Sequence, residues 1–315
     1  MSKFLITGGA GFIGSHIAQS LAGRGQTVRI LDNFSTGRKE NLASVSGKVE
    51  ILEGDIRDRH TVRTAVAGMD FILHQAALVS VTQSVEHPEE TLAINVEGTF
   101  NVLEAAREGR LRRVVLASSC AVYGAGPVPA REDQATMPLS PYAASKLAGE
   151  SLAVSYYSSY ELPVVCLRYF NVYGPRQDSH SPYSGVIAIF IARTLAGQPV
   201  TIFGDGRQTR DFIYVEDVVR ANVLACESDR AVGRVVNIGT GRGRSILDLY
   251  SELAALSGTR PPLQFSAPRT GDIRHSRCAP SSARALLGFT PQTDFRTGLE
   301  ATLRWQRDSS AGRIP

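Results

Sequence analysis

The stretch FLITGGAGFIG, residues 4–14, decides the fold of this chain. Its first part, Phe4–Thr7, is a short apolar run typical of a strand buried on both faces of a parallel sheet, and a helical pattern follows the last glycine. Gly8, Gly11 and Gly14 stand between the two at three-residue spacing. Glycines so placed permit a tight turn, close approach of the backbone to a pyrophosphate, and close packing of helix against strand. Phosphates bound there lie at the positive end of the helix dipole, so the stretch predicts a dinucleotide site.

A second signal comes from the next predicted strand, Thr27–Leu31, which is followed by Asp32. The glycine spacing is GxxGxxG rather than the commoner GxGxxG, and a glycine motif alone is a weak indication of a dinucleotide site. Here a strand precedes the motif, a helix follows it, and an acidic residue ends the next strand. A carboxylate at that point hydrogen-bonds the adenosine ribose and repels a 2′-phosphate, so NAD is predicted rather than NADP.

Two more strand ends supply candidate cofactor contacts, because ligands bind at the carboxyl edge of open α/β sheets. Asp55 and Ile56 follow a predicted strand, and Asp55 either accepts from the adenine amine or remains a solvated loop aspartate. In the segment HQAA that follows the next strand, small residues let a dinucleotide approach the backbone, while His74 is more typical of a structural histidine. The residues predicted to contact NAD are Gly8, Gly11, Phe12, Ile13, Gly14, Asp32, Asn33, Asp55, Ile56, Gln75, Ala76, Ala77, Tyr142 and Lys146.

The first two thirds of the chain alternate short apolar runs with helical patterns. In Thr91–Arg107, apolar side chains recur at helical spacing along one face, beginning at Leu92 and ending at Leu103. Strands that alternate with helices form βαβ units, so the predicted fold class is α/β, a Rossmann-like, doubly wound parallel sheet. The predicted strands are Phe4–Thr7, Thr27–Leu31, Val49–Glu53, Phe71–Leu73, Val114–Ala117 and Val164–Leu167.

From about Tyr173 the pattern loosens, because prolines become frequent and loops lengthen between shorter elements. We predict a smaller C-terminal substrate lobe whose segments interleave with the first domain, and the apolar run Val235–Ile238 can rejoin the sheet. The predicted NAD-binding domain comprises residues 1–170 plus about 211–238. The predicted lobe comprises about 171–210 plus 239–306, and residues 307–315 form a tail without periodicity.

Composition excludes several classes of protein. The chain has 315 residues, of which 43% are hydrophobic and 20% charged, as in ordinary globular proteins. A net charge of +4 with scattered basic residues predicts no nucleic-acid surface, and no stretch is apolar for long enough to be a signal peptide or a membrane span. Cys120, Cys166, Cys226 and Cys278 are widely spaced, so neither a metal site nor a disulfide scaffold is predicted. A reducing compartment, the cytoplasm, is expected.

The segment YAASK, residues 142–146, carries the candidate chemistry, with Ser118 and Ser119 upstream. On a helix, positions four apart share a face, so the Tyr142 phenol and the Lys146 ammonium point into one cleft. A neighbouring ammonium, together with a positive nicotinamide ring, is expected to lower the pKa of the phenol from its usual value near ~10. Tyr142 can then take a proton from a sugar hydroxyl as hydride leaves the same carbon for NAD, while Ser119 hydrogen-bonds that oxygen. The motif Y-x-x-x-K is common by chance and gains its meaning from the dinucleotide motif before it.

Together these segments resemble the extended short-chain dehydrogenase/reductases, and within them the UDP-glucose/UDP-N-acetylglucosamine 4-epimerases. The resemblance runs from the glycine motif to about Trp305, almost the whole chain. The segments that carry it are TGGAGFIGSH from Thr7, HQAA from His74, SSCAVYG from Ser118, SPYAASK from Ser140, LRYFNVYGPRQ from Leu167, TRDFIYVEDV from Thr209 and PRTGDIRHS from Pro268.

The resemblance implies roles for particular residues. Ser119, Tyr142 and Lys146 match the catalytic residues of the family. Arg210 and Arg269 resemble the two arginines that clamp the UDP diphosphate, a role that suits the bidentate geometry of arginine. The full set implied to contact the substrate is Ser119, Tyr142, Asn171, Arg210, Arg269, Asp272 and Ser276. Ser276 falls where side-chain size limits the pocket around the sugar's 2-substituent, and a small serine there predicts that an N-acetyl group fits.

The reaction implied is inversion at C4 of a UDP-hexose, either UDP-GlcNAc/UDP-GalNAc, UDP-Glc/UDP-Gal or both. Tyr142 deprotonates the 4-hydroxyl as the C4 hydride leaves, the resulting 4-ketose turns about its phosphate linkage, and the hydride returns to the opposite face. UDP is held firmly while the sugar is held loosely, so that binding energy from the nucleotide positions a ring that still turns. The resemblance also implies a homodimer that pairs the helix after Glu90 and the helix carrying Tyr142 with their symmetry mates in a four-helix bundle.

Three other functions stay open at this point. One is a net NAD(P)H-dependent reductase acting on a nucleotide sugar, which would consume its cofactor stoichiometrically. Related dehydratases resemble Thr-Asp-Glu where this chain reads Ser119-Cys120-Ala121, so the acid–base pair for elimination is absent, although the Cys120 thiol could serve in a less common elimination. A packed small cysteine is the simpler interpretation of Cys120. A non-catalytic NAD-binding sensor would typically lack the Tyr/Lys pair, which this chain retains.

Overall fold

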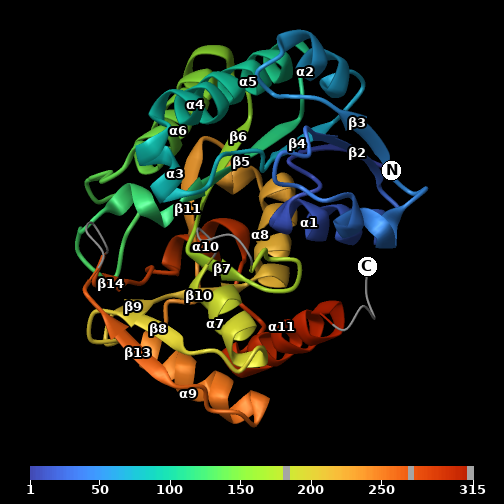
Figure 1. The fold of residues 1–315 in the computed structure, drawn as a ribbon. Helices are drawn as coiled ribbons and strands as arrows, with labels where there is room; N and C mark the ends of the chain where they lie inside the picture. The colour runs from blue at the N-terminus through green and yellow to red at the C-terminus, as the bar shows by residue number, and fades with distance from the viewer. Residues whose placement is uncertain (180–184, 269–272, 311–315) are drawn as a thin grey trace.

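A seven-stranded parallel sheet forms the centre of the computed structural model, which describes residues 1–179, 185–268 and 273–310 (Figure 1). The strand order is β11-β6-β5-β4-β1-β2-β3. The bounds are β1 Lys3–Thr7, β2 Thr27–Asp32, β3 Glu50–Glu53, β4 Phe71–His74, β5 Arg113–Ser119, β6 Val164–Tyr169 and β11 Arg234–Ile238. Because β1 has β2 on one side and β4 on the other, the chain changes direction across the sheet there, which opens a crevice at the carboxyl ends. This confirms the predicted doubly wound α/β fold.

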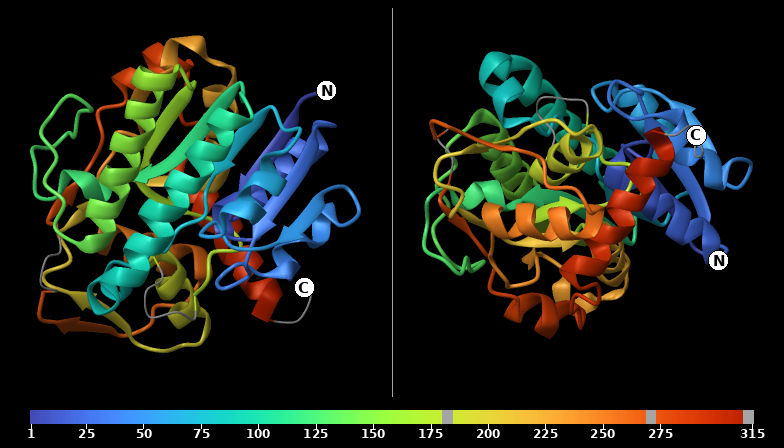
Figure 2. Two further views of the ribbon diagram at one scale, coloured as in Figure 1. Left: turned by 90° about the horizontal axis from the view of Figure 1, so that it is seen from above. Right: turned by 60° about the horizontal axis from the view of Figure 1, so that its bottom comes forward.

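Helices cover both faces of the sheet, and Figure 2 shows its strands running side by side between them. On one face lie α1 (Phe12–Gly23), α8 (Val215–Glu227) and α10 (Ser281–Leu287); on the other lie α2 (Arg59–Val66), α5 (Gly98–Glu108) and α6 (Pro141–Tyr160). Burial on both faces explains why the inner strands read as continuous apolar runs in the sequence, whereas the edge strand β3 is mostly exposed. Short 3₁₀ turns at Lys39–Val45, Cys120–Tyr123 and Asp229–Ala231 connect these elements.

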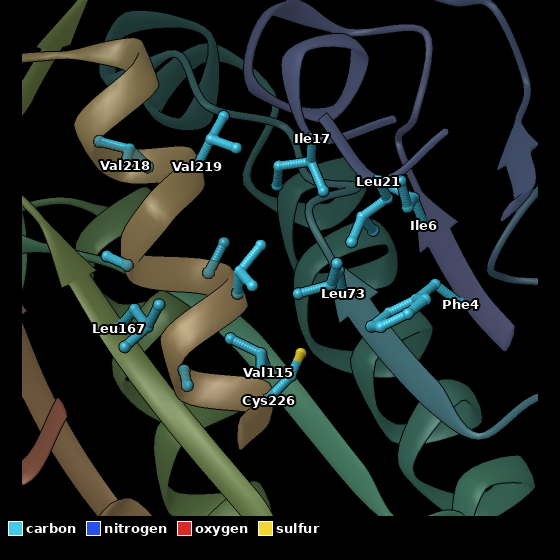
Figure 3. Close-up of a cluster of buried hydrophobic side chains, with 14 of the residues drawn as sticks. Phe4, Ile6, Ile17, Leu21, Leu73, Val115, Leu167, Val218, Val219 and Cys226 are labelled. Atoms are coloured by element: carbon cyan, nitrogen blue, oxygen red, sulfur yellow. The ribbon is translucent and has the colours of Figure 1, made fainter. Parts of the chain in front are cut away.

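The core on the α1/α8 face fixes the dinucleotide-binding helix to the sheet. Ile17 and Leu21 of α1 are buried against the sheet, where they meet Val218 and Val219 of α8 (Figure 3). Leu73, Val115 and Leu167 supply the sheet side of the same cluster. Each such side chain contributes about 1.5–3 kcal/mol of burial free energy, so the position of α1 is set by the core and not by its glycines alone.

The helix predicted at Thr91–Arg107 is longer and less regular than the periodicity suggested. It begins as α4 (Pro88–Leu92), continues through a π-helical segment at Ala93–Glu97, and ends as α5. Within the π segment, Asn95 Nδ2 donates to the carbonyl of Leu78 (2.9 Å) and to Ser145 Oγ (2.9 Å), and Asn95 Oδ1 accepts from Leu78 N (2.8 Å). The irregular turn therefore ties the loop after β4 to helix α6, as π segments near functional sites often do. The preceding helix, α3, spans Val81–Glu86.

A smaller lobe lies at the foot of the sheet in Figure 1, with its own buried core of side chains from α7, α9 and α11. Its helices are α7 Val186–Leu195, α9 Ile246–Ser257 and α11 Phe295–Ser310, and its strands are β7 Asn171–Tyr173, β8 Val200–Phe203, β9 Thr209–Arg210, β10 Phe212–Tyr214, β12 Arg244–Ser245, β13 Leu263–Ser266 and β14 His275–Ser276. These strands form three small sheets, β10-β7, β12-β9-β14 and β13-β8. Helix α11 runs to Ser310, into the segment 307–315 that the sequence predicts as a tail.

In the described part of the chain, none of the helices has both the length and the hydrophobicity that a membrane crossing requires.

Candidate active site

The glycine loop between β1 and α1 packs so closely against neighbouring backbone that Gly8 and Gly14 leave no room for a side chain. Gly8 adopts a φ of +68°, and a Cβ on it would lie 2.7 Å from Ala76 N. A Cβ on Gly14 would lie 2.2 Å from the carbonyl oxygen of Gly8. Helix α1 begins at Phe12 with Gly11 as its N-cap, and no side chain caps its first N–H groups. These donors, at the positive end of the helix, fit the pyrophosphate of a dinucleotide.

The Asp32 carboxylate closes the far side of this loop. It is buried, and its two oxygens accept from Ala10 N (2.8 Å) and Phe34 N (2.8 Å). Burial raises the pKa of the carboxyl group, and the hydrogen bonds from Ala10 and Phe34 oppose that shift. A carboxylate has about four acceptor sites, so Asp32 keeps capacity for a ribose diol after these two bonds. The loop and Asp32 together fit NAD.

The residues predicted at the adenine end contact one another. Asn33 Nδ2 donates to Asp55 Oδ2 (2.8 Å), and Arg57 forms a two-point ion pair with the same carboxylate, with nitrogen–oxygen distances of 2.9 and 2.7 Å. The hydrogen bond from Arg57 is the main reason that the pKa of Asp55 falls to about 2. The Ile56 side chain is buried against Gly98, where a Cβ would lie 2.5 Å from the Ile56 Cδ1 atom. Arg57 therefore competes for the oxygens that Asp55 was predicted to offer to adenine.

The segment after β4 faces the glycine loop, since Gly8 abuts the backbone of Gln75 and Ala76. Gln75 Nε2 donates to Tyr169 Oη (3.1 Å) and Asn222 Oδ1 (3.2 Å), so its side chain points toward β6 and α8 rather than toward α1. Ala76 and Ala77 are half-buried, as are Phe12 and Ile13 at the start of α1. Small side chains at 76 and 77 leave the backbone accessible from the crevice.

His74 has hydrogen-bond partners on both ring nitrogens and serves the structure. Thr99 Oγ1 donates to the carbonyl of Asn95 (2.6 Å), so it accepts from the His74 Nε2–H (3.0 Å). His74 Nδ1 then accepts from Thr7 Oγ1 (2.6 Å). Burial, and secondarily the charge of Lys146, lowers the pKa of His74 to about 3. The ring is therefore neutral at physiological pH, as expected for a structural histidine.

The three predicted catalytic residues converge where β5 ends against α6. Tyr142 and Lys146 lie one turn apart on α6, which is capped by the Ser140 side chain accepting from Ala143 N (3.1 Å). Lys146 Nζ donates to the carbonyl of Ala117 (3.0 Å) in β5, and the Ser119 hydroxyl lies close enough to the Tyr142 phenol to lower its pKa. Both α6 side chains are half-buried. The arrangement can take a proton from a bound hydroxyl and pass it toward Ser119.

The pKa of Tyr142 differs from the sequence expectation. Burial raises it to about 12, outweighing the hydrogen bond from Ser119, which lowers it. The predicted lowering invoked Lys146 and the nicotinamide ring together; in the chain itself, desolvation of the phenol is the largest effect and acts in the opposite direction. Burial also lowers the pKa of Lys146 to about 8, against the charge of Glu150, which raises it.

The smaller lobe brings Ser276 and Arg210 to the same place. In the small sheet, Ser276 of β14 is paired with Arg210 of β9, and Ser276 Oγ donates to Cys120 Sγ (3.9 Å). Burial raises the pKa of the Cys120 thiol to about 11 despite the hydrogen bond from Ser276. Cys120 follows Ser119 directly in the sequence. Ser276, the predicted size-limiting residue, therefore lies in the same region as Ser119, the predicted catalytic serine, although the two are far apart in the sequence.

Asn171 and the segment at Arg210 are also brought together. Asn171 N and Nδ2 both donate to the carbonyl of Asp211 (3.0 and 3.2 Å), and Arg210 Nη1 donates to the carbonyl of Thr209 (2.9 Å). The buried Asp211 carboxylate, which sequence reasoning missed, accepts from Thr240 N (2.8 Å), Gly241 N (2.9 Å) and Cys278 N (3.1 Å). In the sequence, the signal that could have pointed to Asp211 is its position directly after Arg210.

Two predicted substrate contacts, Arg269 and Asp272, lie outside the described residues. Within the described residues, no group of three or more His, Cys, Asp or Glu side chains is arranged to hold a metal ion.

The doubly wound sheet, the glycine loop with Asp32 and the Tyr142–Lys146 pair define a Rossmann-type enzyme that uses a dinucleotide. Residues 4–239 match the model of the NAD dependent epimerase/dehydratase family, and the chain belongs to this family. Membership confirms the predicted extended short-chain dehydrogenase/reductase relationship and NAD as the cofactor.

Individual relatives are similar over nearly their whole length. The chain is 42% identical to the UDP-glucose 4-epimerase of Mycolicibacterium smegmatis over 313 residues, which are 98% of this chain and 99% of that protein. The chain is also similar to the solved structure of a UDP-N-acetylglucosamine 4-epimerase from Methanobrevibacter ruminantium in complex with UDP-N-acetylmuramic acid, with a TM-score of 0.94 and 37% identity. The match covers 98% of this chain and 99% of that chain. The solved structure of a Thermus thermophilus UDP-glucose 4-epimerase in complex with NAD is similar with a TM-score of 0.90 and 40% identity. That match covers 97% of this chain and 99% of that chain.

Proposed function

We propose that this enzyme is a UDP-hexose 4-epimerase that interconverts UDP-GlcNAc and UDP-GalNAc, UDP-Glc and UDP-Gal, or both pairs. One observation carries the proposal: the Tyr142 phenol lies close enough to Ser119 for the serine to lower its pKa, and one helical turn from Lys146, beside the carboxyl edge of the sheet that holds the glycine loop. The 4-epimerase activity named for the relatives from M. smegmatis and M. ruminantium supports the same assignment.

In the proposed reaction, Tyr142 takes the proton of the sugar 4-hydroxyl while Ser119 hydrogen-bonds the same oxygen. NAD, when bound, supplies a hydride acceptor for C4 and a hydride donor for the return. Lys146 holds a positive charge beside the phenol and so favours the phenolate that serves as base. The 4-keto sugar then turns about its phosphate linkage, and Tyr142 gives the proton back. Asn171, Arg210 and Arg269 hold the diphosphate meanwhile, so that nucleotide binding energy positions a sugar that still moves.

The chemistry of Cys120 argues against elimination. A 4,6-dehydratase needs an acid and a base near C5 and C6, whereas Ala121 is apolar and the thiol of Cys120, with its pKa raised to about 11, stays neutral at physiological pH. The complete set of Ser119, Tyr142 and Lys146 argues equally against a non-catalytic sensor.

We assign the other predicted roles on the same basis. The NAD contacts are the glycine loop, Asp32 and the segments at Asn33, Asp55 and Gln75. The NAD-binding domain comprises residues 1–170 plus about 211–238, supported by the pairing of β11 with β6 in the large sheet. Residues 171–210 plus 239–306 form the UDP-sugar lobe, in which Asp272 receives the uridine ribose.

An N-acetylated substrate is supported by the small side chain of Ser276, whose hydroxyl contacts the thiol of Cys120 next to the predicted catalytic serine. The contribution of each sugar pair is testable directly. Purified protein is incubated separately with UDP-GlcNAc, UDP-Glc and UDP-glucuronate without added cofactor, with products read by NMR and NADH by absorbance. The expected result is the C4 epimer with no net NADH. A 4-keto-6-deoxy or unsaturated product would contradict the assignment, and turnover of UDP-Glc without UDP-GlcNAc would contradict the preference for N-acetylated sugars.

The enzyme is also proposed to be a cytoplasmic homodimer, in which α4, the π segment, α5 and α6 form a four-helix bundle with their symmetry mates. The supporting observation is apolar surface on these helices: Leu92 is 49% exposed, and Ile94, Phe100 and Leu152 are only partly buried. Four free cysteines are consistent with a reducing compartment. Light scattering should give a dimer mass for the wild type and a monomer mass for Leu92→Glu. The matched control is Phe265→Glu on β13, which is 58% exposed in the other lobe and should leave the dimer intact.

A further inference from the structure

A buried ion pair lies directly behind the candidate catalytic residues. Arg168 Nε and Nη2 of β6 donate to Glu150 Oε1 (2.8 Å) and Oε2 (2.6 Å) of α6, and the two side chains are only 5% and 4% exposed. The Ser118 hydroxyl donates to Glu150 Oε1 (2.5 Å). Arg168 also lies over the Tyr123 ring, 4.7 Å from its centroid. Charges buried this deeply are costly to desolvate, so the position of the pair calls for an explanation.

Glu150 is connected to the catalytic residues through the helix and through the strand. Tyr142, Lys146 and Glu150 occupy successive turns of one face of α6, because they are four residues apart. On the strand side, Ser118 stands between Ala117, whose carbonyl accepts from Lys146, and Ser119, which lowers the pKa of Tyr142. Sequence reasoning singled out the Tyr–Lys spacing but did not extend it by one turn to Glu150.

The charge of Glu150 acts on Lys146. Burial lowers the pKa of Lys146 to about 8, and the Glu150 carboxylate is the charge that raises it. Among the described residues, the other groups around Lys146 and Glu150 are neutral or cationic: His74 of β4 has its pKa lowered to about 3 by burial, burial raises the pKa of Cys166 of β6, and Arg168 is a cation. The phenol of Tyr123 stays neutral because burial raises its pKa to about 12. The π segment and α5 present the polar side chains of Asn95 and Thr99.

We propose that Glu150 is a positioning residue for the reaction: fixed by Arg168 and Ser118, it keeps Lys146 charged and directed at the Ala117 carbonyl beside Tyr142. The inference rests on the proposed function, in which the ammonium of Lys146 stabilises the Tyr142 phenolate. Loss of the Glu150 carboxylate removes its attraction for the Lys146 ammonium and leaves the positive charge of Arg168 uncompensated. Both effects favour the neutral form of Lys146.

The composition of the chain makes a direct test possible, because it has only four lysines, Lys3, Lys39, Lys48 and Lys146. The holoenzyme labelled with ¹³C- and ¹⁵N-lysine is titrated by NMR, and Lys146 is assigned by its loss in Lys146→Arg. In Glu150→Gln, the Lys146 midpoint should fall by about one pH unit or more, as expected for loss of a neighbouring charge. The pH above which kcat declines should fall by the same amount as the Lys146 midpoint. At a pH above the midpoints of both the wild type and the variant, the variant should therefore be roughly tenfold slower.

Control variants separate charge from structure. Glu150→Asp keeps the charge and should return the midpoint toward the wild-type value. Glu108→Gln removes an exposed glutamate that pairs with Arg63 (2.7 Å) and should change neither readout. Should Glu150→Gln fail to fold, the double variant Glu150→Gln/Arg168→Gln replaces the charged pair by a neutral one and should still titrate below the wild type.

A Lys146 midpoint that is the same in the wild type, in Glu150→Gln and in the double variant would overturn the inference. The titration needs no sugar substrate, so the two proposals fail separately. Absence of epimerase turnover in the unsubstituted enzyme overturns the proposed function, and a constant midpoint overturns only the role of Glu150.

Discussion

Gly14 stands against Gly8 so closely that a Cβ on Gly14 would lie 2.2 Å from the Gly8 carbonyl oxygen and 2.8 Å from Gly9 Cα. The contact is between backbones, so no side-chain rotation can relieve it. The first turn of α1 therefore reaches the end of β1 only because residue 14 is glycine, and this contact sets how near the helix dipole comes to a bound phosphate.

Gly14→Ala should consequently push α1 away from the loop, with loss of NAD from the purified protein and a destabilisation of about 1–3 kcal/mol from overpacking. Bound NAD is measured by absorbance after denaturation, and stability by urea unfolding. Gly23→Ala is the matched control, because Gly23 lies in the same helix and none of the described residues comes within 4 Å of an added Cβ there. It should retain NAD and gain up to about 1 kcal/mol of stability. Equal NAD content in both variants would contradict the role given to Gly14.

Tyr142→Phe should abolish epimerisation while leaving the fold and the cofactor in place. The phenol is the proposed base and acid, and removal of such a group typically costs about 10²–10⁴-fold in rate. Turnover is followed by NMR, and NAD retention by absorbance. Tyr157→Phe, which alters a tyrosine that is 39% exposed on the same helix, should turn over like the wild type. An undiminished rate in Tyr142→Phe would remove the assignment of Tyr142.

Cys120→Ala should retain epimerase activity within a few-fold. The thiol has its pKa raised to about 11 by burial, so it is neutral at the working pH and supplies no base. The measurement is kcat with each UDP-sugar that the wild type accepts. A loss of roughly 100-fold or more, a size expected for a lost acid or base, would show that Cys120 takes part in proton transfer and would reopen elimination as the reaction.

Ser276→Tyr should discriminate against N-acetylated sugars. Ser276 meets Cys120 beside the predicted catalytic serine, so a tyrosine would take up space on the side of the pocket assigned to the 2-substituent. We expect kcat/KM for UDP-GlcNAc to fall by about 100-fold, with a smaller change for UDP-Glc, a discrimination within reach of pocket size alone. An equal loss for both sugars would indicate general damage to the pocket, and no loss for either would show that residue 276 does not limit it.

The sequence was sufficient for features that depend on local pattern. The six predicted strands correspond to β1–β6, and the run Val235–Ile238 lies within β11 beside β6. Strands covered on both faces read as apolar runs, and only the edge strand β3 among these six is mostly exposed. Tyr142 and Lys146 share a face because a helix repeats every 3.6 residues. What could not be read from local pattern depends on distant contacts: Ser276 reaches Cys120 through the β9–β14 pairing, and Arg57 takes the Asp55 carboxylate through loop geometry. The π segment also arises from tertiary contacts of Asn95, which no periodicity reveals.

His74 should make the stability of the enzyme sensitive to acid. Its pKa is lowered from 6.5 to about 3 in the folded state, chiefly by burial, so below pH 6.5 the unfolded chain binds a proton that the folded chain does not. Stability is then lost as the pH falls from 6.5 toward 3, at up to about 1.4 kcal/mol per pH unit. His74→Asn replaces the ring by a group that does not titrate. The variant should be less stable than the wild type at pH 7, because it loses the hydrogen bonds to Thr7 and Thr99. Its free energy of unfolding should nevertheless decline less steeply between pH 6.5 and 4. Urea unfolding at each pH measures the slope, and His60→Asn, at an exposed position of α2, should keep the wild-type slope. If His74→Asn and the wild type lose stability in parallel, the buried ring is protonated as readily in the folded as in the unfolded chain, and other groups carry the acid sensitivity.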